Sequence, residues 1–144
     1  MMLVDVAAAQ TECRRDIIFV LDESGSVGSA NFDLMKSFVS QLVGGFEIEN
    51  NNTRVGVVTY SSSVGESFQL NSYSTVDDVQ NAISSLTYSG GSTRTDEALE
   101  YVRTTMLTTS NGDRSDVPNV VVVFTDGKST NGGDTKVSIQ VYQV

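Results

Sequence analysis

The fold of this chain is decided by residues 16–26, which run Asp-Ile-Ile-Phe-Val-Leu-Asp-Glu-Ser-Gly-Ser. The five consecutive apolar residues 17–21 predict a strand that is buried on both faces. The apolar run ends at Asp22, and Ser24 and Ser26 follow at alternate positions. A carboxylate and two hydroxyls are hard oxygen donors, which suit a small hard cation such as Mg²⁺. The stretch therefore predicts a metal-binding turn at the end of a buried strand.

Three further segments predict the other strands of a sheet. Residues 54–60 and 120–124 are apolar runs that predict two more buried strands. Residues 66–70 alternate between polar and apolar side chains, which is typical of a short edge strand. The short connection that precedes this strand favours an antiparallel hairpin with the strand at 54–60.

Three segments carry apolar residues at three- and four-residue spacing, which predicts amphipathic helices. Ser29 is expected to cap the first helix. A capping box of Ser74 and Asp77 is expected at the second, and the third begins at Thr95. The apolar faces that we expect in the core are formed by Phe32, Met35, Phe38, Val39, Leu42, Val43 and Phe46, then by Val76, Val79, Ile83 and Leu86, and then by Leu99, Val102 and Met106.

Strands that alternate with helices predict an α/β fold with right-handed crossovers. We expect a doubly wound, mostly parallel central sheet with one antiparallel edge strand and helices on both faces. In such sheets, ligands bind beyond the carboxyl ends of the strands. Asp22 and Asp126 each follow a buried strand directly, so both are expected at this edge.

Three segments resemble, in order, the motifs of the von Willebrand factor type A domain, also called the integrin inserted domain. They are residues 19–28, Phe-Val-Leu-Asp-Glu-Ser-Gly-Ser-Val-Gly; residues 90–99, Gly-Gly-Ser-Thr-Arg-Thr-Asp-Glu-Ala-Leu; and residues 121–129, Val-Val-Val-Phe-Thr-Asp-Gly-Lys-Ser. The resemblance covers residues 16 to about 134 and implies the Rossmann-like fold of that family. The chain departs from the family pattern at Asp96, where a glycine is usual, and this adds a negative charge near the site.

The resemblance implies a metal-ion-dependent adhesion site with the ligands Asp22, Ser24, Ser26, Thr93 and Asp126. The serine and threonine hydroxyls would bind the ion, and the two aspartates would hold it directly or through waters. Thr95 is interpreted as the cap of the following helix. Mg²⁺ or Mn²⁺ is the expected cofactor, because Mg²⁺ takes an octahedron of oxygens and keeps waters readily. Neutral hydroxyls leave the ion's charge partly uncompensated, so it would favour a Glu or Asp carboxylate of a protein partner.

The resemblance also divides the chain. Residues 1–14 are a leader or a disordered start, 15–134 a partial type A domain, and 135–144 an atypical tail. The tail alternates apolar and polar residues like a strand, whereas family members continue with a helix and further strand–helix units. We therefore expect the last strands and the C-terminal helix of the family fold to be missing. The strand at 120–124 would then lie at an open sheet edge, which favours aggregation unless the tail or another chain covers it.

The family implies a secreted, non-enzymatic adhesion or extracellular-matrix module, with collagen or another matrix protein as the candidate partner. Extracellular members often carry a cysteine at the position of Cys13, and Asn51-Asn52-Thr53 fits the N-glycosylation acceptor pattern. One alternative is an intracellular type A subunit of a multiprotein assembly. Another is a Mg²⁺-dependent phosphatase of the haloacid-dehalogenase kind, but that class needs a second acid where Ser24 stands.

The composition argues against several other classes of function. The chain has 18 acidic and 9 basic residues, a net charge of −9, which gives no electrostatic footprint for nucleic acid. It contains no apolar run long enough for a transmembrane helix, so no membrane insertion is expected. It also contains no histidine, which removes the usual acid–base catalyst and histidine-ligated zinc.

Overall fold

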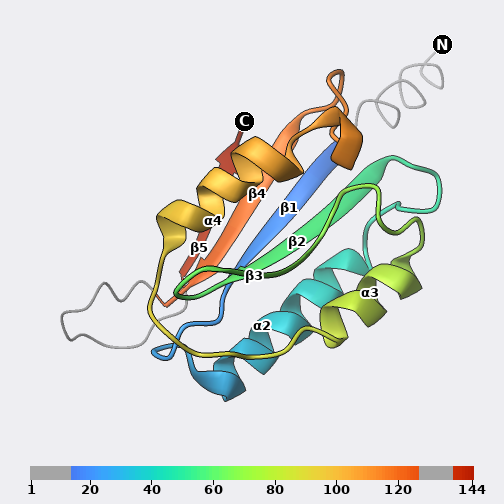
Figure 1. The fold of residues 1–144 in the computed structure, drawn as a ribbon. Helices are drawn as coiled ribbons and strands as arrows, with labels where there is room; N and C mark the ends of the chain where they lie inside the picture. Colours follow the sequence, from blue (N-terminus) through green and yellow to red (C-terminus); the bar gives the residue numbers. More distant parts are fainter. Residues whose placement is uncertain (1–13, 127–137) are drawn as a thin grey trace, which may run out of the picture.

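A five-stranded mixed sheet forms the centre of the molecule (Figure 1). The structure is a computed structural model that describes residues 14–126 and 138–144. The strand order is β3-β2-β1-β4-β5. The strands are β1 (Arg15–Asp22), β2 (Thr53–Tyr60), β3 (Val64–Phe68), β4 (Asn119–Thr125) and β5 (Ser138–Gln143). Strands β1, β2 and β4 are parallel, and β3 and β5 are antiparallel to their neighbours at the two edges.

Strand β1 lies in the middle of the sheet because its apolar run supplies side chains to both faces. Phe19 and Leu21 belong to one buried cluster, and Ile18 and Val20 belong to the other. All four side chains are at most 1% exposed. The prediction of a strand buried on both faces is therefore confirmed, and it fixes β1 as the structural centre of the domain.

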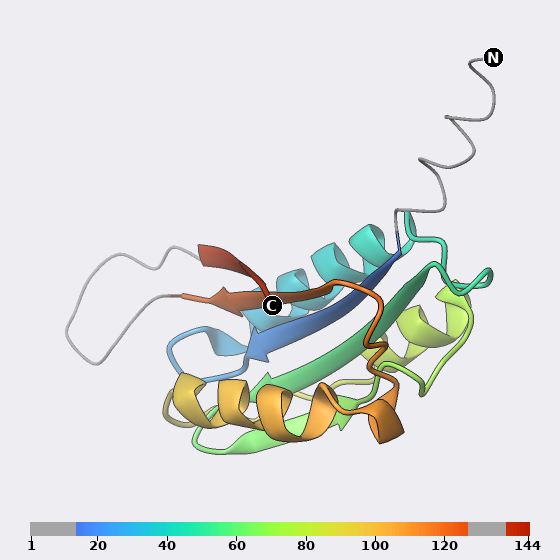
Figure 2. The ribbon, with the colours of Figure 1, turned by 90° about the horizontal axis from the view of Figure 1, so that it is seen from above.

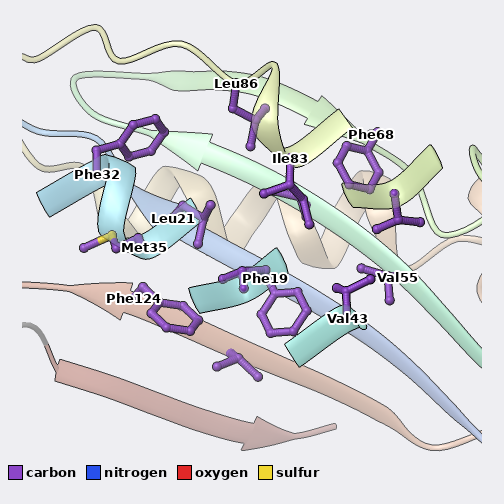
Figure 3. Close-up of a cluster of buried hydrophobic side chains, with 14 of the residues drawn as sticks. Phe19, Leu21, Phe32, Met35, Val43, Val55, Phe68, Ile83, Leu86 and Phe124 are labelled. Carbon is purple, nitrogen blue, oxygen red and sulfur yellow. The ribbon is translucent and has the colours of Figure 1, made fainter. Parts of the chain in front are cut away.

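Helices cover both faces of the sheet, as predicted (Figure 2). Helices α2 (Gly28–Val43) and α3 (Val76–Ser84) pack on one face, where Phe19, Leu21 and Phe124 meet their apolar side chains (Figure 3). Helix α4 (Thr95–Tyr101) covers the other face and continues into the π-helical turn η1 (Val102–Met106). A short 3₁₀ turn, η2 (Thr109–Asn111), follows.

Two predicted helix starts are wrong by one or two residues. Helix α2 begins at Gly28 and its N-cap position is Val27, without a side-chain cap, so Ser29 does not cap it. The cap of α3 is Thr75, whose backbone is extended and whose hydroxyl accepts a hydrogen bond from Asp78 N at 3.1 Å. The capping box predicted one residue earlier at Ser74 is therefore not formed, because neighbouring hydroxyl residues offer equivalent caps and only the chain path selects one.

The predicted apolar face of α2 is too wide. Phe32, Met35, Val39 and Val43 are buried against the sheet, whereas Phe38 and Leu42 are 43% and 37% exposed. The two exposed positions lie beside the buried row rather than in it. Phe38 still stacks edge-on against the ring of Phe124, with ring centroids 5.9 Å apart.

The tail forms the strand that its alternation predicted. Strand β5 pairs antiparallel with β4, from Thr125↔Ser138 to Val120↔Gln143, so β4 is not an open edge. The sheet thus has an antiparallel strand at each edge, one more than the sequence predicted. The hairpin of β2 and β3 is confirmed, although β3 begins at Val64, two residues before the predicted start. Residues 1–13 and 127–137, with Cys13 and the end of the third motif, lie outside the described residues.

A buried ion pair closes the amino end of the sheet. Arg114 donates from Nε and Nη2 to Asp16 Oδ1 at 2.9 and 2.6 Å, and its backbone N–H donates to Oδ2 at 2.9 Å. Asp16 is fully buried and Arg114 is 9% exposed. The same guanidinium donates to the carbonyls of Asn51, Asn52 and Arg15. This network connects three separate segments at the end of the sheet opposite to Asp22.

Candidate metal centre

The first predicted ligands share one turn at the carboxyl end of β1. Asp22 is fully buried, and its Oδ1 accepts a hydrogen bond from Ser24 N at 2.8 Å. Ser24 Oγ lies 3.2 Å from Ser26 Oγ. Neighbouring ligands in a Mg²⁺ octahedron, each about 2.1 Å from the ion, are separated by about 3.0 Å. The two hydroxyl oxygens are therefore spaced as adjacent ligands of one small cation would be.

Strand β4 brings the last predicted ligand to the same edge. Leu21 of β1 pairs with Phe124 of β4, so Asp22 and Thr125 are neighbours across the two strands. The Thr125 hydroxyl donates to Asp22 Oδ2 at 2.7 Å. Asp126 follows directly and is 3% exposed. Both oxygens of Asp22 thus accept a hydrogen bond within the protein, which fixes the orientation of this carboxylate toward the turn and toward β4.

The loop after α3 is bonded to the first turn at three points. Gly25 N donates to the Gly91 carbonyl at 2.8 Å, and Gly90 N donates to the Glu23 carbonyl at 3.1 Å. The Tyr88 hydroxyl donates to the Ser24 carbonyl at 3.2 Å. These bonds hold the second motif against the first, although the two motifs are more than sixty residues apart in the sequence.

Thr93 is positioned by its neighbours in this loop. Arg94 N donates to the Ser61 carbonyl at 2.8 Å on one side, and Ser92 N donates to Ser62 Oγ at 2.9 Å on the other. The Thr93 side chain is half-buried. Within residues 14–126 and 138–144 it makes no hydrogen bond to the other four predicted ligands. The structure therefore joins Asp22, Ser24 and Ser26 by hydrogen bonds, and bonds the loop that carries Thr93 to the same turn through Gly90 and Gly91. The role of Thr93 as a ligand stays a prediction.

Thr95 does not cap α4, contrary to the sequence prediction. The N-cap position is Arg94, without a side-chain cap, and Thr95 is the first helical residue. Its hydroxyl instead lies 3.0 Å from the hydroxyl of Tyr60. The difference arises because the partner of Thr95 comes from β2, a distant segment that local pattern does not reveal.

Tyr60 borders the candidate site, and the sequence analysis did not identify it. It ends β2, pairs with Asp22 across the two strands, and is fully buried. Burial raises the pKa of its phenol, and the charges of Asp22 and Asp126 raise it further. Hydrogen bonds with Thr95 and Thr125 act in the opposite direction. The phenol is therefore a neutral, protonated group beside the two carboxylates. Its place at the last position of a buried strand was the available signal, as it was for Asp22.

Glu23 is a second buried acid in the first turn, and it contacts the β2–β3 hairpin. It is 3% exposed, and its Oε1 accepts a hydrogen bond from the Thr59 hydroxyl at 3.3 Å. Desolvation raises the pKa of this carboxyl, although hydrogen bonds from Ser89 and Thr59 oppose the shift. A Cβ at Gly65 would come within 2.5 Å of Oε1, so the glycine leaves the space that this side chain occupies.

The unusual Asp96 is paired with a neighbouring arginine. Arg94 donates from Nε and Nη2 to the two carboxylate oxygens of Asp96 at 3.0 and 2.8 Å. It also lies 3.1 Å from a carboxylate oxygen of Glu97. Hydrogen bonding to Arg94 lowers the pKa of Asp96 to about 2. The added negative charge that the sequence predicted here is therefore compensated by the residue two positions earlier.

Comparison with known protein families identifies the family of this chain. The model of the von Willebrand factor type A domain matches residues 16–143. The chain belongs to the von Willebrand factor type A domain family. Its three motifs and its sheet topology are those of this family, so the expectation that the resemblance raised is confirmed for both the family and the fold.

Relatives of this type A domain include matrix proteins, among them matrilin-1 and collagen VI chains. The chain is 39% identical over 114 residues to matrilin-1 of Gallus gallus, covering 79% of this chain and 23% of the relative. It is 38% identical over 118 residues to the collagen alpha-4(VI) chain of Mus musculus, covering 81% of this chain and 5% of the relative. The type A domain thus spans less than a quarter of the length of these relatives.

Solved structures agree with this assignment. The structure of proximal thread matrix protein 1 from the mussel byssus superimposes with a TM-score of 0.75 at 31% identity, covering 85% of this chain and 33% of that one. A second structure of that protein, with a zinc-occupied MIDAS motif, gives a TM-score of 0.74 at 30% identity, covering 86% and 34%. A related type A domain therefore holds a divalent metal at its adhesion-site motif.

Proposed function

We propose that this type A domain is a metal-dependent protein-binding module of the extracellular matrix. It holds Mg²⁺ or Mn²⁺ with Asp22, Ser24, Ser26, Thr93 and Asp126, and the ion coordinates a Glu or Asp carboxylate of a protein partner. The observation that carries the proposal is the turn after β1. There, two hydroxyl oxygens lie 3.2 Å apart beside a buried carboxylate whose orientation is fixed from two sides.

The donor set explains why such an ion would bind a carboxylate from outside. Hydroxyl ligands are neutral, and both oxygens of Asp22 already accept hydrogen bonds from Ser24 and Thr125. The ion therefore keeps much of its positive charge, and an anionic ligand is favoured in its remaining position. Ser26 is exposed, so the site is accessible from the solvent.

The relatives support the matrix setting and the class of partner. Besides matrilin-1, the relatives include a collagen VI chain and a protein named as a thread matrix protein. None of these names is that of an enzyme, and we propose a binding role without catalysis. No helix among residues 14–126 and 138–144 has the length and apolar character needed to cross a membrane. We propose a secreted protein with collagen or another matrix protein as its partner.

A metal titration followed by thermal unfolding tests this function. Binding to the native state alone raises the melting temperature as the ligand concentration increases, by about 2.7 kcal/mol of stability at a hundredfold excess over Kd. We expect Mg²⁺ and Mn²⁺ to stabilise the wild type and not a Ser24→Ala variant. Ser29→Ala, an exposed hydroxyl deletion five residues later, is the matched control and should respond like the wild type.

Binding to immobilised matrix proteins completes the test. We expect the domain to bind a collagen or another matrix protein in Mg²⁺, and to be released by EDTA. Ser24→Ala should not bind. Equal stabilisation of the wild type and Ser24→Ala by millimolar metal would contradict the metal site, whereas binding that survives EDTA would contradict only the metal-dependent contact.

A further inference from the structure

The turn between α2 and β2 presents one asparagine whose side chain lies at the surface, with room for an attached group on its nitrogen. Asn51 is exposed and has a left-handed backbone, with φ 62°. Its Oδ1 accepts a hydrogen bond from Arg54 Nε at 3.0 Å, and its carbonyl accepts one from Arg114 Nη1 at 2.5 Å. The hydrogen bond from Arg54 therefore holds the side-chain oxygen in place. Within the described part of the chain, Asn51 Nδ2 donates no hydrogen bond.

The neighbouring asparagines differ from Asn51 in the hydrogen bonding of the side-chain nitrogen and in the residue two positions later. Asn50 Nδ2 and Asn52 Nδ2 donate to Glu47 Oε2 at 3.3 and 2.7 Å. Neither residue is followed two positions later by a serine or threonine, whereas Asn51 is followed by Thr53. The acceptor pattern and the free amide nitrogen therefore coincide at one position of an asparagine-rich turn.

We propose that Asn51 carries an N-linked glycan. The proposal rests on the secreted location proposed above, and it does not depend on the metal site. A bond forms between Asn51 Nδ2 and the anomeric carbon of a lipid-linked oligosaccharide diphosphate. The bond from that carbon to the diphosphate breaks, the diphosphate leaves with the electron pair, and one amide proton is released. Nothing is oxidised or reduced.

The burial of Thr53 determines when the transfer occurs. Thr53 begins β2, pairs with Arg15 and is 7% exposed. An enzyme that recognises the threonine hydroxyl together with the asparagine cannot reach it in the folded domain. The glycan is therefore added to the chain before β2 joins the sheet. The folded structure then accommodates it, because the Asn51 side chain is at the surface.

The position of the glycan leaves the metal centre accessible. Strands β1 and β2 are parallel and in register from Arg15↔Thr53 to Asp22↔Tyr60. Seven residue steps of about 3.3 Å separate the two ends, which is about 23 Å. Glycosylation at Asn51 thus shields the amino end of the sheet and does not cover the edge at which the partner is expected to bind.

The test is expression of the full chain behind a cleavable secretion signal in a eukaryotic cell, with intact-mass measurement of the chain from both cells and medium. We expect a mass increase that peptide N-glycosidase removes. Asn51→Asp and Thr53→Val should both lack it, and Asn50→Gln and Thr53→Ser should retain it. The readout is covalent and the transfer precedes folding, so a destabilised variant is still informative.

An unmodified wild-type chain would overturn the proposal, and so would a glycan that persists in Asn51→Asp. The metal titration separates this result from the proposed function. We expect Asn51→Asp to keep the same Mg²⁺-dependent rise in melting temperature as the wild type. Loss of that rise in the wild type would contradict the metal site and leave the mass measurement unaffected.

Discussion

Individual side chains in the first turn have separable roles. Asp22 is fully buried and accepts hydrogen bonds from Ser24 N and from the Thr125 hydroxyl. Ser26 is exposed, and its hydroxyl contacts the hydroxyl of Ser24. Asp22 therefore contributes to the folded structure as well as to the proposed site, whereas Ser26 contributes to the site alone.

This difference predicts that two variants differ in their free energy of unfolding in EDTA. Asp22→Ala removes the carboxylate that accepts from the buried Ser24 N–H, at about 1–3 kcal/mol, so its stability should fall without metal. Ser26→Ala removes an exposed hydroxyl and should stay within about 0.5 kcal/mol of the wild type. Urea unfolding measures both. In Mg²⁺, neither variant should be stabilised, and a full metal response from Ser26→Ala would exclude its hydroxyl as a ligand.

The ion pair between Arg94 and Asp96 predicts a low pKa for the Asp96 carboxyl group. Asp96 should titrate with a pKa of about 2, and Arg94→Gln should return it toward the ordinary value of 3.8. Because the folded-state pKa is lowered, the interaction stabilises the protein above pH 3.8 and is lost as the pH falls toward 2. Carbon NMR of the side-chain carboxyl measures the midpoint.

A second exposed pair supplies the internal control for that titration. Glu100 is lowered in pKa by Arg103, not by Arg94, so its midpoint should not change in Arg94→Gln. If the pKa of Asp96 is the same in the wild type and in Arg94→Gln, Arg94 does not lower that pKa in solution.

Among the elements of the fold, the loop between α3 and α4 joins the second motif to the first. Gly91 has a φ of 113°, and its carbonyl accepts the hydrogen bond from Gly25 N. A Cβ at Gly91 would lie 2.7 Å from Ser62 Oγ. An alanine there is disfavoured by both the backbone conformation and the available space.

Gly91→Ala should therefore weaken metal binding through displacement of the loop that carries Thr93. We expect Gly91→Ala to need a higher Mg²⁺ concentration than the wild type for half-maximal stabilisation. Its melting temperature in EDTA should change less than its metal affinity does. Gly45→Ala is the control, because that glycine has no positive φ and its Cβ would meet only an ordinary contact at 3.5 Å. Unchanged metal affinity in Gly91→Ala would show that the loop adapts to the added methyl group.

The sequence predicts elements well where the signal is local. The apolar run of β1 and the acids that follow β1 and β4 are sufficient to place Asp22 and Asp126 at one edge of the sheet. Tyr60 and Thr125 are missed because their roles depend on the lateral register of strands. The N-cap of α3 is missed because Ser74 and Thr75 are chemically similar and the chain path alone selects one of them.

At the scale of the whole molecule, the buried pair of Asp16 and Arg114 lies at the end of the sheet opposite to the proposed metal site. Removing one partner of a buried pair costs about 3–5 kcal/mol, because the other charge stays buried. That is a large part of the about 5–15 kcal/mol that stabilises a typical domain. We expect Asp16→Asn to be strongly destabilised in urea unfolding, while the remaining folded fraction still binds Mg²⁺.

The chain offers a matched surface pair for comparison. Arg14 and Asp116 form an ion pair at 3.0 Å, and their side chains are 37% and 71% exposed. Asp116→Asn should change the stability by about 0–1 kcal/mol. Equal effects of Asp16→Asn and Asp116→Asn would mean that the buried pair contributes no more than the exposed one.

The neutral phenol of Tyr60, close to Asp22 and Asp126, should report binding of the proposed metal through its fluorescence. The chain contains five tyrosines and no tryptophan, so tyrosine emission is not masked by indole. Carboxylates close to a phenol quench its excited state, and a cation that draws on their charge reduces this quenching. We expect ultraviolet emission to rise as Mg²⁺ is added and Tyr60→Phe to abolish the change, so that occupancy can be followed without a dye.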